Sequence, residues 1–230
     1  LKHTASVSCL SGILRAPQKT TARETPAKLT CRCGDVQILF HHPRLKYRVE
    51  CCCNECQEVM DWAAGRCQPC QQVNTTPRNK DLCYFQNDVT VAQGGESLKW
   101  YILRSGGTPR YVAECCSTVL GMVHPAYFGN AVMVYADSGR LTDFDPIDQQ
   151  LSLFQYDLTA SELAALPPST LRAVSKLPWG LIGMLPFIRT MLRKVPLPRK
   201  GVAMEVMMWH HGPPINLELN SSSTAARPSL

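Results

Sequence analysis

The middle of the chain alternates short apolar runs with glycine-rich turns. A turn at residues 31–34 opens into a run in which Val36, Ile38 and Phe40 occupy every second position. Alternation with a period of two is typical of a strand with one buried face. Further runs of β-branched and aromatic residues lie at 47–49, 83–85, 89–91, 98–103, 110–112 and 131–135. The pattern predicts a mainly β domain that ends near Asp157.

The last third of the chain has a helical pattern instead. Thr159 or Ser161 can cap a short helix. From Trp179 to Lys194 the only charged residues are basic, and apolar residues recur at intervals of three and four: Ile182, Leu185, Ile188 and Leu192. Two roles fit a basic amphipathic helix. Residues 177–194 contact an anionic membrane surface or a partner protein, or the apolar stripe packs back on the β domain.

These patterns divide the chain into three segments. Residues 1–28 are rich in Ser and Thr and contain one acid, Glu24, which is typical of a disordered basic leader or an organelle transit segment. Residues 29–157 form the predicted β domain, and residues 158–230 a helical basic extension with a disordered tail. Because the leader has no apolar run typical of a secretory signal, we expect an intracellular, cytoplasmic protein unless the leader directs import into an organelle.

The net charge of +6 lies in the two ends of the chain. Residues 31–157 carry 11 basic and 14 acidic side chains, so the predicted β domain is mildly acidic. Nucleic-acid binding needs Lys and Arg gathered on the folded part, and sequence-specific binding by this domain is therefore not expected. The longest apolar stretch, residues 177–188, has 12 residues. A membrane span needs about 18, so a single-pass membrane protein is not expected either.

Cysteines are concentrated in the predicted β domain, where 11 of the 12 lie between Cys31 and Cys116. They form three groups, which are Cys31-x-Cys33-Gly34, the C-x-C-x-x-C frame of Cys51, Cys53 and Cys56, and the pair Cys115-Cys116. Zinc takes four ligands in tetrahedral geometry, and thiolates one to three residues apart can face one ion when the backbone turns tightly between them. The spacing therefore predicts one or two zinc ions.

The order of these motifs resembles the family of glutathione-dependent formaldehyde-activating enzymes and centromere protein V. The resemblance runs from about Leu29 to Asp145 and includes the strand at 98–103 and the closing run at 132–141. It implies an Mss4-like fold of several small coiled antiparallel sheets organised around zinc. It also implies two zinc sites, a structural one at Cys31, Cys33 and Cys116 and a catalytic one at Cys51, Cys53 and Cys56.

Three positions depart from the family pattern. Cys52 stands where the family usually has histidine, Ala113 stands at a ligand position, and Ser117 stands at a glycine position. The structural site is therefore short of one thiolate. Cys115 could supply it, although adjacent residues of a strand point to opposite faces.

The resemblance implies a carbon–sulfur lyase that acts on glutathione-type thiol adducts of the S-hydroxymethylglutathione class. A zinc ion with three cysteine ligands keeps an open position, which suits glutathione or another small thiol adduct. One alternative is a non-catalytic zinc module, with Cys52 or another side chain as fourth ligand, whose basic ends bind a partner or a membrane surface. A thiol redox protein centred on Cys67 and Cys70 is a further alternative; otherwise this CxxC pair is a half-site for zinc or two loop thiols without a fixed role.

The remaining reactive residues have weaker patterns. Glu55 and Glu58 lie beside the C-x-C-x-x-C frame and could move protons, although acids in a short polar stretch are usually solvated. The pairs His41-His42 and His210-His211 show no ligand spacing, and we expect them in exposed loops. Cys9 reads as a tail residue and Cys83 as a buried strand residue.

Overall fold

The computed structural model describes residues 25–66, 80–164, 171–172 and 178–217. The predictions made for the leader, Cys9, Cys67, Cys70 and the last residues of the tail lie outside the described residues.

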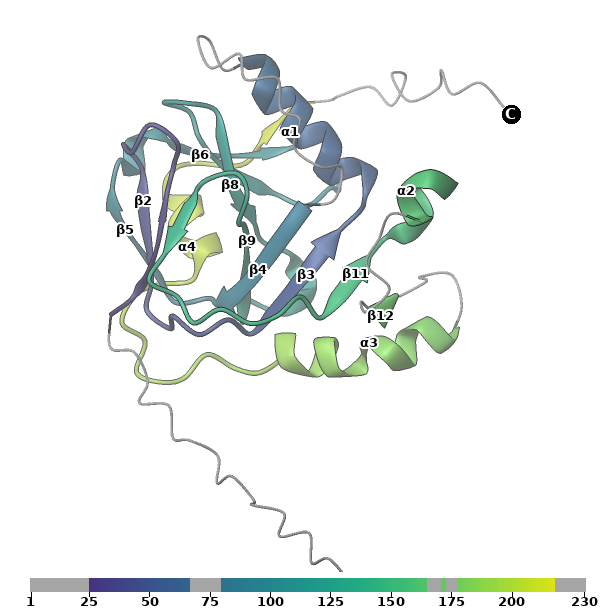
Figure 1. The fold of residues 1–230 in the computed structure, drawn as a ribbon. Coiled ribbons are helices and arrows are strands. Elements are labelled where there is room, and N and C mark those ends of the chain that lie inside the picture. The colour runs from purple at the N-terminus through teal and green to yellow at the C-terminus, as the bar shows by residue number, and fades with distance from the viewer. Residues whose placement is uncertain (1–24, 67–79, 165–170, 173–177, 218–230) are drawn as a thin grey trace, which may run out of the picture.

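Two β-sheets form the framework (Figure 1). The smaller one is antiparallel with strand order β10-β1-β2-β5, formed by β1 (Ala27–Thr30), β2 (Gln37–Phe40), β5 (Val89–Gln93) and β10 (Arg140–Thr142). The larger one has the order β12-β11-β3-β4-β9-β8-β7-β6-β13. Its strands are β3 (Tyr47–Cys51), β4 (Lys80–Gln86), β6 (Leu98–Ile102), β7 (Arg110–Ala113), β8 (Thr118–Met122), β9 (Ala131–Tyr135), β11 (Leu151–Leu153), β12 (Leu171–Arg172) and β13 (Ile215–Asn216).

The prediction of a mainly β fold is confirmed, and the predicted runs at 83–85, 89–91, 98–103, 110–112 and 131–135 all fall on strands. The expectation of several small antiparallel sheets is wrong in one respect. The large sheet is mixed, because β11 pairs in parallel with β3 and β12, and β13 pairs in parallel with β6. Two of these edge strands, β12 and β13, come from the segment beyond residue 157, so this segment extends the sheet as well as supplying helices.

The large sheet is buried on both faces. Along β4, Leu82 and Tyr84 belong to one hydrophobic core and Cys83 and Phe85 to the other, as expected for successive residues of a strand. Helices α1 (Asn54–Arg66) and α3 (Pro178–Met191) cover the first core, whereas the small sheet and α4 (Met204–His210) cover the second (Figure 1). The buried position of Cys83 confirms the prediction for that residue.

Short helices complete the framework. Three 3₁₀ turns lie at Gly95–Ser97, Pro125–Tyr127 and Gln155–Asp157. Helix α2 (Ala160–Ala164) begins after a capping box, in which the Glu162 N–H donates to Thr159 Oγ1 at 3.3 Å and the Thr159 N–H donates to Glu162 Oε2 at 2.6 Å. The predicted cap at Thr159 is confirmed. In the part of the chain that the structure describes, no helix is long and apolar enough to cross a membrane.

Helix α3 packs on the sheet with a different face from the predicted one. Phe187 and Met191 are buried, at 3% and 0% exposure, in the first core. Leu185, Ile188 and Leu192 of the predicted stripe face solvent instead, at 58%, 36% and 43% exposure, and the side chain of Ile182 lies outside the described residues. Because almost every residue of this helix is apolar, a spacing of three and four did not distinguish the packed face from the exposed one.

A glycine in the centre of the large sheet tests this packing. Gly121 of β8 lies where a Cβ atom would collide with the Tyr111 hydroxyl and with the carbonyl oxygen of Met133, which are hydrogen-bonded to each other. We expect Gly121→Ala to lower the free energy of unfolding by about 3 kcal/mol or more, measured by urea denaturation. Gly65→Ala is the control, since Gly65 has open space in α1 and alanine should stabilise that helix by about 0.5–1 kcal/mol. Equal effects of the two variants would contradict the packing described.

Candidate metal centres

Three thiols converge where β3 ends and α1 begins. Cys51 is the last residue of the strand, and Cys53 and Cys56 lie before and within the first turn of the helix. The Cys51 sulfur lies 3.4 Å from that of Cys53 and 3.6 Å from that of Cys56. Cys53 Sγ also accepts the backbone N–H of Cys56 at 3.3 Å, and the N–H of Asn54 donates to Asp157 at 2.9 Å. The helix start is thus capped by sulfur and by a carboxylate from a distant turn.

The spacing of these three sulfurs suits a metal ion. Sulfurs around one tetrahedral zinc ion at about 2.3 Å are separated by about 3.8 Å, close to the distances found here. The same distances are far longer than a disulfide bond of about 2.05 Å, and all three thiols are free. This group, called the three-thiol group below, can therefore hold a thiophilic ion, and its own members provide three ligands.

Four other thiols converge between two tight turns. Cys31 and Cys33 lie in the turn after β1, and Cys115 and Cys116 in the turn between β7 and β8. The Cys33 sulfur is 3.2 Å from that of Cys115 and 3.4 Å from that of Cys31, and Cys31 and Cys115 are 3.8 Å apart. All four ligand atoms lie within 4.8 Å of one another. This four-thiol group offers a complete tetrahedral set of its own.

The geometry corrects the expectation about Cys115. Residues 114–117 form a turn rather than a strand, so the rule that neighbours point to opposite faces does not apply there. Ser117 has a left-handed backbone conformation with φ of 52°, at the position where the family pattern has glycine. Ala113, at the position of the missing ligand, is fully buried in β7. The structure thus brings Cys31, Cys33 and Cys116 together, with Cys115 as fourth thiol.

Each group contains one thiol with a lowered pKa. Hydrogen bonds with Cys51 and Cys53, together with the charge of Arg110, hold the pKa of Cys56 well below its usual value, against burial. Hydrogen bonds with Cys53 and Cys56 raise the pKa of Cys51. In the other group, burial raises the pKa of Cys116, but hydrogen bonds from Thr118 and Cys33 outweigh it and give a value of about 7. Burial raises the pKa of Cys33 to about 11.

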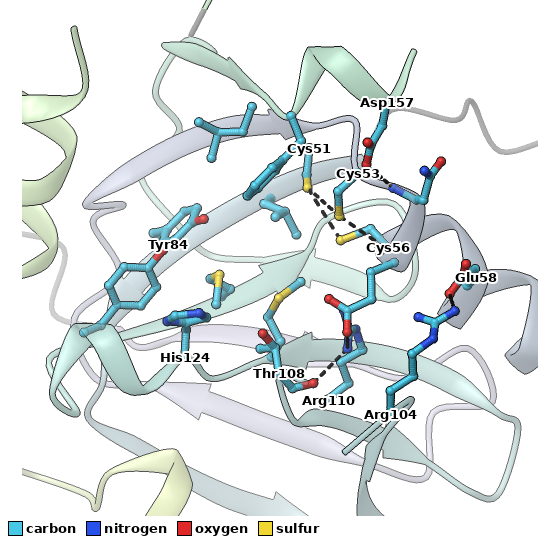
Figure 2. Close-up of a pocket in the computed structure, with 18 of the residues that line it drawn as sticks. Cys51, Cys53, Cys56, Glu58, Tyr84, Arg104, Thr108, Arg110, His124 and Asp157 are labelled. Carbon is cyan, nitrogen blue, oxygen red and sulfur yellow. Dashed lines mark hydrogen bonds and ion pairs between the residues drawn. The ribbon is translucent and has the colours of Figure 1, made fainter. Parts of the chain in front are cut away.

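A pocket of about 590 Å³ opens beside the three-thiol group. Figure 2 shows the three sulfurs turned toward one another at one side, with Tyr84 and His124 opposite. Most of the other walls are apolar or aromatic: Leu82, Met122, Tyr127, Met133, Leu153, Phe154 and Phe187. Phe187 of α3 packs edge-on against Tyr84, with ring centroids 5.4 Å apart. Helix α3 therefore supplies part of the pocket wall.

Two ion pairs line the same pocket. Arg110, whose side chain is 1% exposed, lies 3.1 Å from Glu55, and Arg104 lies 2.6 Å from Glu58. Arg110 also donates to the carbonyl oxygen of Thr108 at 2.8 Å. For Glu55 and Glu58 the sequence left open a role in proton transfer or simple solvation. Both lie on the first two turns of α1, line the pocket and are paired with arginine.

His124 is a pocket residue that the sequence did not indicate. Its Nδ1 accepts the backbone N–H of Ala126 at 3.2 Å, so the neutral ring carries its proton on Nε2. Burial lowers the pKa of His124, against a smaller opposite effect of the Glu55 charge, so the ring is neutral at pH 7.

The other candidate residues belong to neither thiol group. His41 is hydrogen-bonded to Thr90 at 2.8 Å, and His42 lies 3.3 Å from the buried Asp88. His210 ends α4, and His211 follows it. Cys52 is fully buried, and the three-thiol group does not include it.

The sequence matches no model of a known protein family, and a search of curated proteins gives no significant match. The indications of function therefore come from the two thiol groups and the pocket beside the first of them.

We expect the protein to bind two thiophilic ions per chain. Cys115→Ser should bind one of them at least about tenfold more weakly, because the four-thiol group would keep three of its four ligands, whereas the three-thiol group would be unchanged. The measurement is a Cd²⁺ titration followed by thiolate absorption, with Cd²⁺ per chain after gel filtration as a second readout. Cys83→Ala is the matched control, since Cys83 is buried in the second core and belongs to neither group, and it should bind both ions as wild-type protein does. Unchanged affinity for both ions in Cys115→Ser would contradict the assignment of Cys115.

Metal binding at the three-thiol group should depend on pH. Cys51 is protonated at neutral pH because its pKa is raised. For Cys53 the hydrogen bond with Cys51 lowers the pKa, but the bond with Cys56 and burial outweigh it, so this thiol is protonated as well. A bound ion must displace both protons, and its apparent Kd should fall as pH rises, by roughly a hundredfold per unit near neutrality. Titration of Cys115→Ser with Cd²⁺ between pH 6 and 8 measures this slope; a flat profile would contradict it.

Proposed function

We propose that the protein is a zinc-dependent carbon–sulfur lyase that acts on adducts between a glutathione-type thiol and an aldehyde. Zinc at the three-thiol group is part of this proposal. The order of the cysteine motifs, which resembles the family of glutathione-dependent formaldehyde-activating enzymes, supports it. An Mss4-like fold and a structural zinc ion in the four-thiol group belong to the same proposal.

The observation that carries the proposal is the difference between the two thiol groups. The four-thiol group supplies all the ligands of a tetrahedral ion, as structural sites do. The three-thiol group supplies one fewer, and it borders a pocket of about 590 Å³. Three protein ligands beside an accessible cavity are typical of a site whose fourth position takes a substrate.

Residues of the pocket suit the cleavage of such an adduct. A zinc ion held by Cys51, Cys53 and Cys56 would supply a soft Lewis acid and a coordination position for the substrate sulfur. In the cleavage, the carbon–sulfur bond breaks with its electron pair going to sulfur, and the adduct hydroxyl loses its proton as the carbonyl forms. Glu55 faces the pocket and can accept that proton, while Arg110 fixes its carboxylate in place. The Nε2–H of His124 can donate to the substrate oxygen.

The apolar walls indicate which part of the adduct the pocket holds. Aromatic and aliphatic side chains from β4, β8, β9 and α3 surround the space opposite the thiols. Burial of an apolar group there releases about 25 cal/mol per Å². We therefore expect adducts of apolar aldehydes to bind more tightly than the adduct of formaldehyde.

The test compares zinc-loaded wild-type protein with Cys53→Ser. Exchange between glutathione, formaldehyde and S-hydroxymethylglutathione can be followed by NMR line shape or magnetisation transfer. We expect wild-type protein to accelerate the exchange and Cys53→Ser to lose at least about a hundredfold of that acceleration, because the zinc would lose one of three ligands.

Cys33→Ser is the matched control, because it removes one ligand from the four-thiol group instead. It should keep the turnover number per folded chain while binding the ion of the four-thiol group at least about tenfold more weakly. Equal rates for wild-type protein and Cys53→Ser, or a wild-type rate no faster than the uncatalysed exchange, would contradict the proposal.

A further inference from the structure

The segment from residue 185 to 200 combines exposed apolar side chains with an uninterrupted positive charge. Five basic residues lie in it and no acidic one: Arg189, Arg193, Lys194, Arg199 and Lys200. All five are exposed. Leu197 is 84% exposed, in addition to Leu185 and Ile188 of α3 and Leu192 directly after it. This segment is called the basic ridge below.

Helix geometry shows that the apolar side of the basic ridge is not the side that packs on the sheet. Successive residues of a helix are rotated by about 100°. Phe187 and Met191, which are buried, lie within about 40° of each other, whereas Leu185, Ile188 and Leu192 cluster about 110° away from them. Helix α3 therefore has two apolar faces, and the fold uses one of them.

A cationic pocket of about 390 Å³ lies at the end of the same helix. Its walls are His42, Arg44, Leu45, Lys46, Gln86, Thr190 and Arg193, so every titratable side chain lining it is a base. Asp88, which is fully buried, lies 3.3 Å from His42. A concave site lined by cations and a threonine hydroxyl suits an anion such as a phosphate.

Lys46 links this pocket to the C-terminal end of α3. Its ammonium group donates to the backbone carbonyls of Met191 at 3.4 Å and Arg193 at 3.0 Å, and to Asn130 O and Gln86 Oε1. Burial and, to a smaller extent, the positive charge of Arg193 lower the pKa of Lys46 to about 8. The cations of the pocket thus repel one another, and a bound anion would offset that repulsion.

We propose that the basic ridge and the cationic pocket bind the surface of a bilayer that contains anionic phospholipids. Leu185, Ile188 and Leu192 enter the boundary between headgroups and acyl chains, the basic side chains lie among the headgroups, and a lipid phosphate enters the pocket. Aliphatic side chains flanked by Arg and Lys are typical of helices that lie in a membrane interface.

The chemistry of the ridge favours lipid over other occupants. A second copy of the chain would place two sets of cations against each other. Single-stranded nucleic acid is bound by aromatic side chains on which bases stack, whereas the exposed side chains of the ridge are aliphatic. This inference goes beyond the proposed lyase activity and does not depend on either thiol group.

The test is sedimentation of the full chain with vesicles of phosphatidylcholine alone, or of phosphatidylcholine mixed with phosphatidylserine. We expect binding to the mixed vesicles only, weakened by added salt because the charges of the ridge are exposed. The triple variant Leu185→Gln, Ile188→Gln, Leu192→Gln should bind at least about tenfold more weakly, and so should the double variant Arg44→Gln, Arg193→Gln.

A matched control carries the same number of apolar-to-Gln changes at exposed positions outside the ridge. Phe128, Val206 and Ile215 are 78%, 51% and 45% exposed, and their triple replacement by Gln should bind vesicles as wild-type protein does. Thermal unfolding of each variant checks that the fold is retained. Equal binding to both vesicle types, no vesicle binding, or equal loss in the ridge and control variants would overturn the proposal. So would binding of inorganic phosphate, of RNA or of a second chain without binding to vesicles.

Discussion

The large sheet has to be covered on both faces, and the rest of the fold follows from that constraint. Leu82 and Tyr84 of β4 project to one side, and Cys83 and Phe85 to the other, and all four are nearly inaccessible to water. A sheet with two apolar faces is stable only between two layers. The chain supplies α1 and α3 for one face, and the small sheet with α4 for the other. Each cover has to stay attached to the sheet.

Each thiol group lies where a cover meets the large sheet. The three-thiol group is located where β3 passes into α1, and Cys51 and Cys56 are members of the first core. The four-thiol group joins a turn of the small sheet to a turn of the large one, and Cys31 belongs to the second core. An ion bound at either place would link a cover to the sheet, which is a structural effect of the kind that bound metals have on small domains. The difference between the groups is the pocket that α1 and α3 leave open beside the first one.

The strands were predictable from the sequence because their signal is local. Alternation with a period of two located β2, and runs of β-branched and aromatic residues located β5 and β9, all to within one or two residues. Helix α1 was not predicted, although its buried residues Cys56, Val59, Met60 and Ala63 recur at the helical spacing of three and four. The spacing of the cysteines predicted that they can bind metal. For Cys115, however, the rule that neighbouring strand residues point to opposite faces was applied to residues that form a turn. That turn depends on the left-handed backbone conformation of Ser117, which the residues next to it in the sequence do not indicate.

The pocket could not be predicted, because its walls are assembled from residues far apart in the chain. Phe187 lies beside Tyr84 and within reach of Tyr127 only because α3 returns to the face of the sheet that α1 leaves partly uncovered. The ion pairs could not be predicted for the same reason. Arg110 lies on a strand and Arg104 in a loop, whereas their partners Glu55 and Glu58 lie on α1, far away in the sequence. The composition places the excess of basic residues at the two ends of the chain. In the structure, however, Lys46 contacts the carbonyls of Met191 and Arg193, so the basic residues that follow α3 lie beside the β framework.

Helix α3 connects the two proposals physically. Phe187 forms part of the pocket wall, and Ile188, the next residue, lies on the exposed apolar side of the basic ridge. A rotation of the helix that buried Ile188 more deeply in a bilayer would also turn Phe187 relative to Tyr84 and change the space beside the three thiols. Lys46 opposes such a rotation, because its ammonium group holds the carbonyls of Met191 and Arg193. The contacts of Lys46 therefore fix the basic end of helix α3, next to the cationic pocket. The part of α3 that forms a wall of the other pocket, beside the three thiols, is held in place from that end.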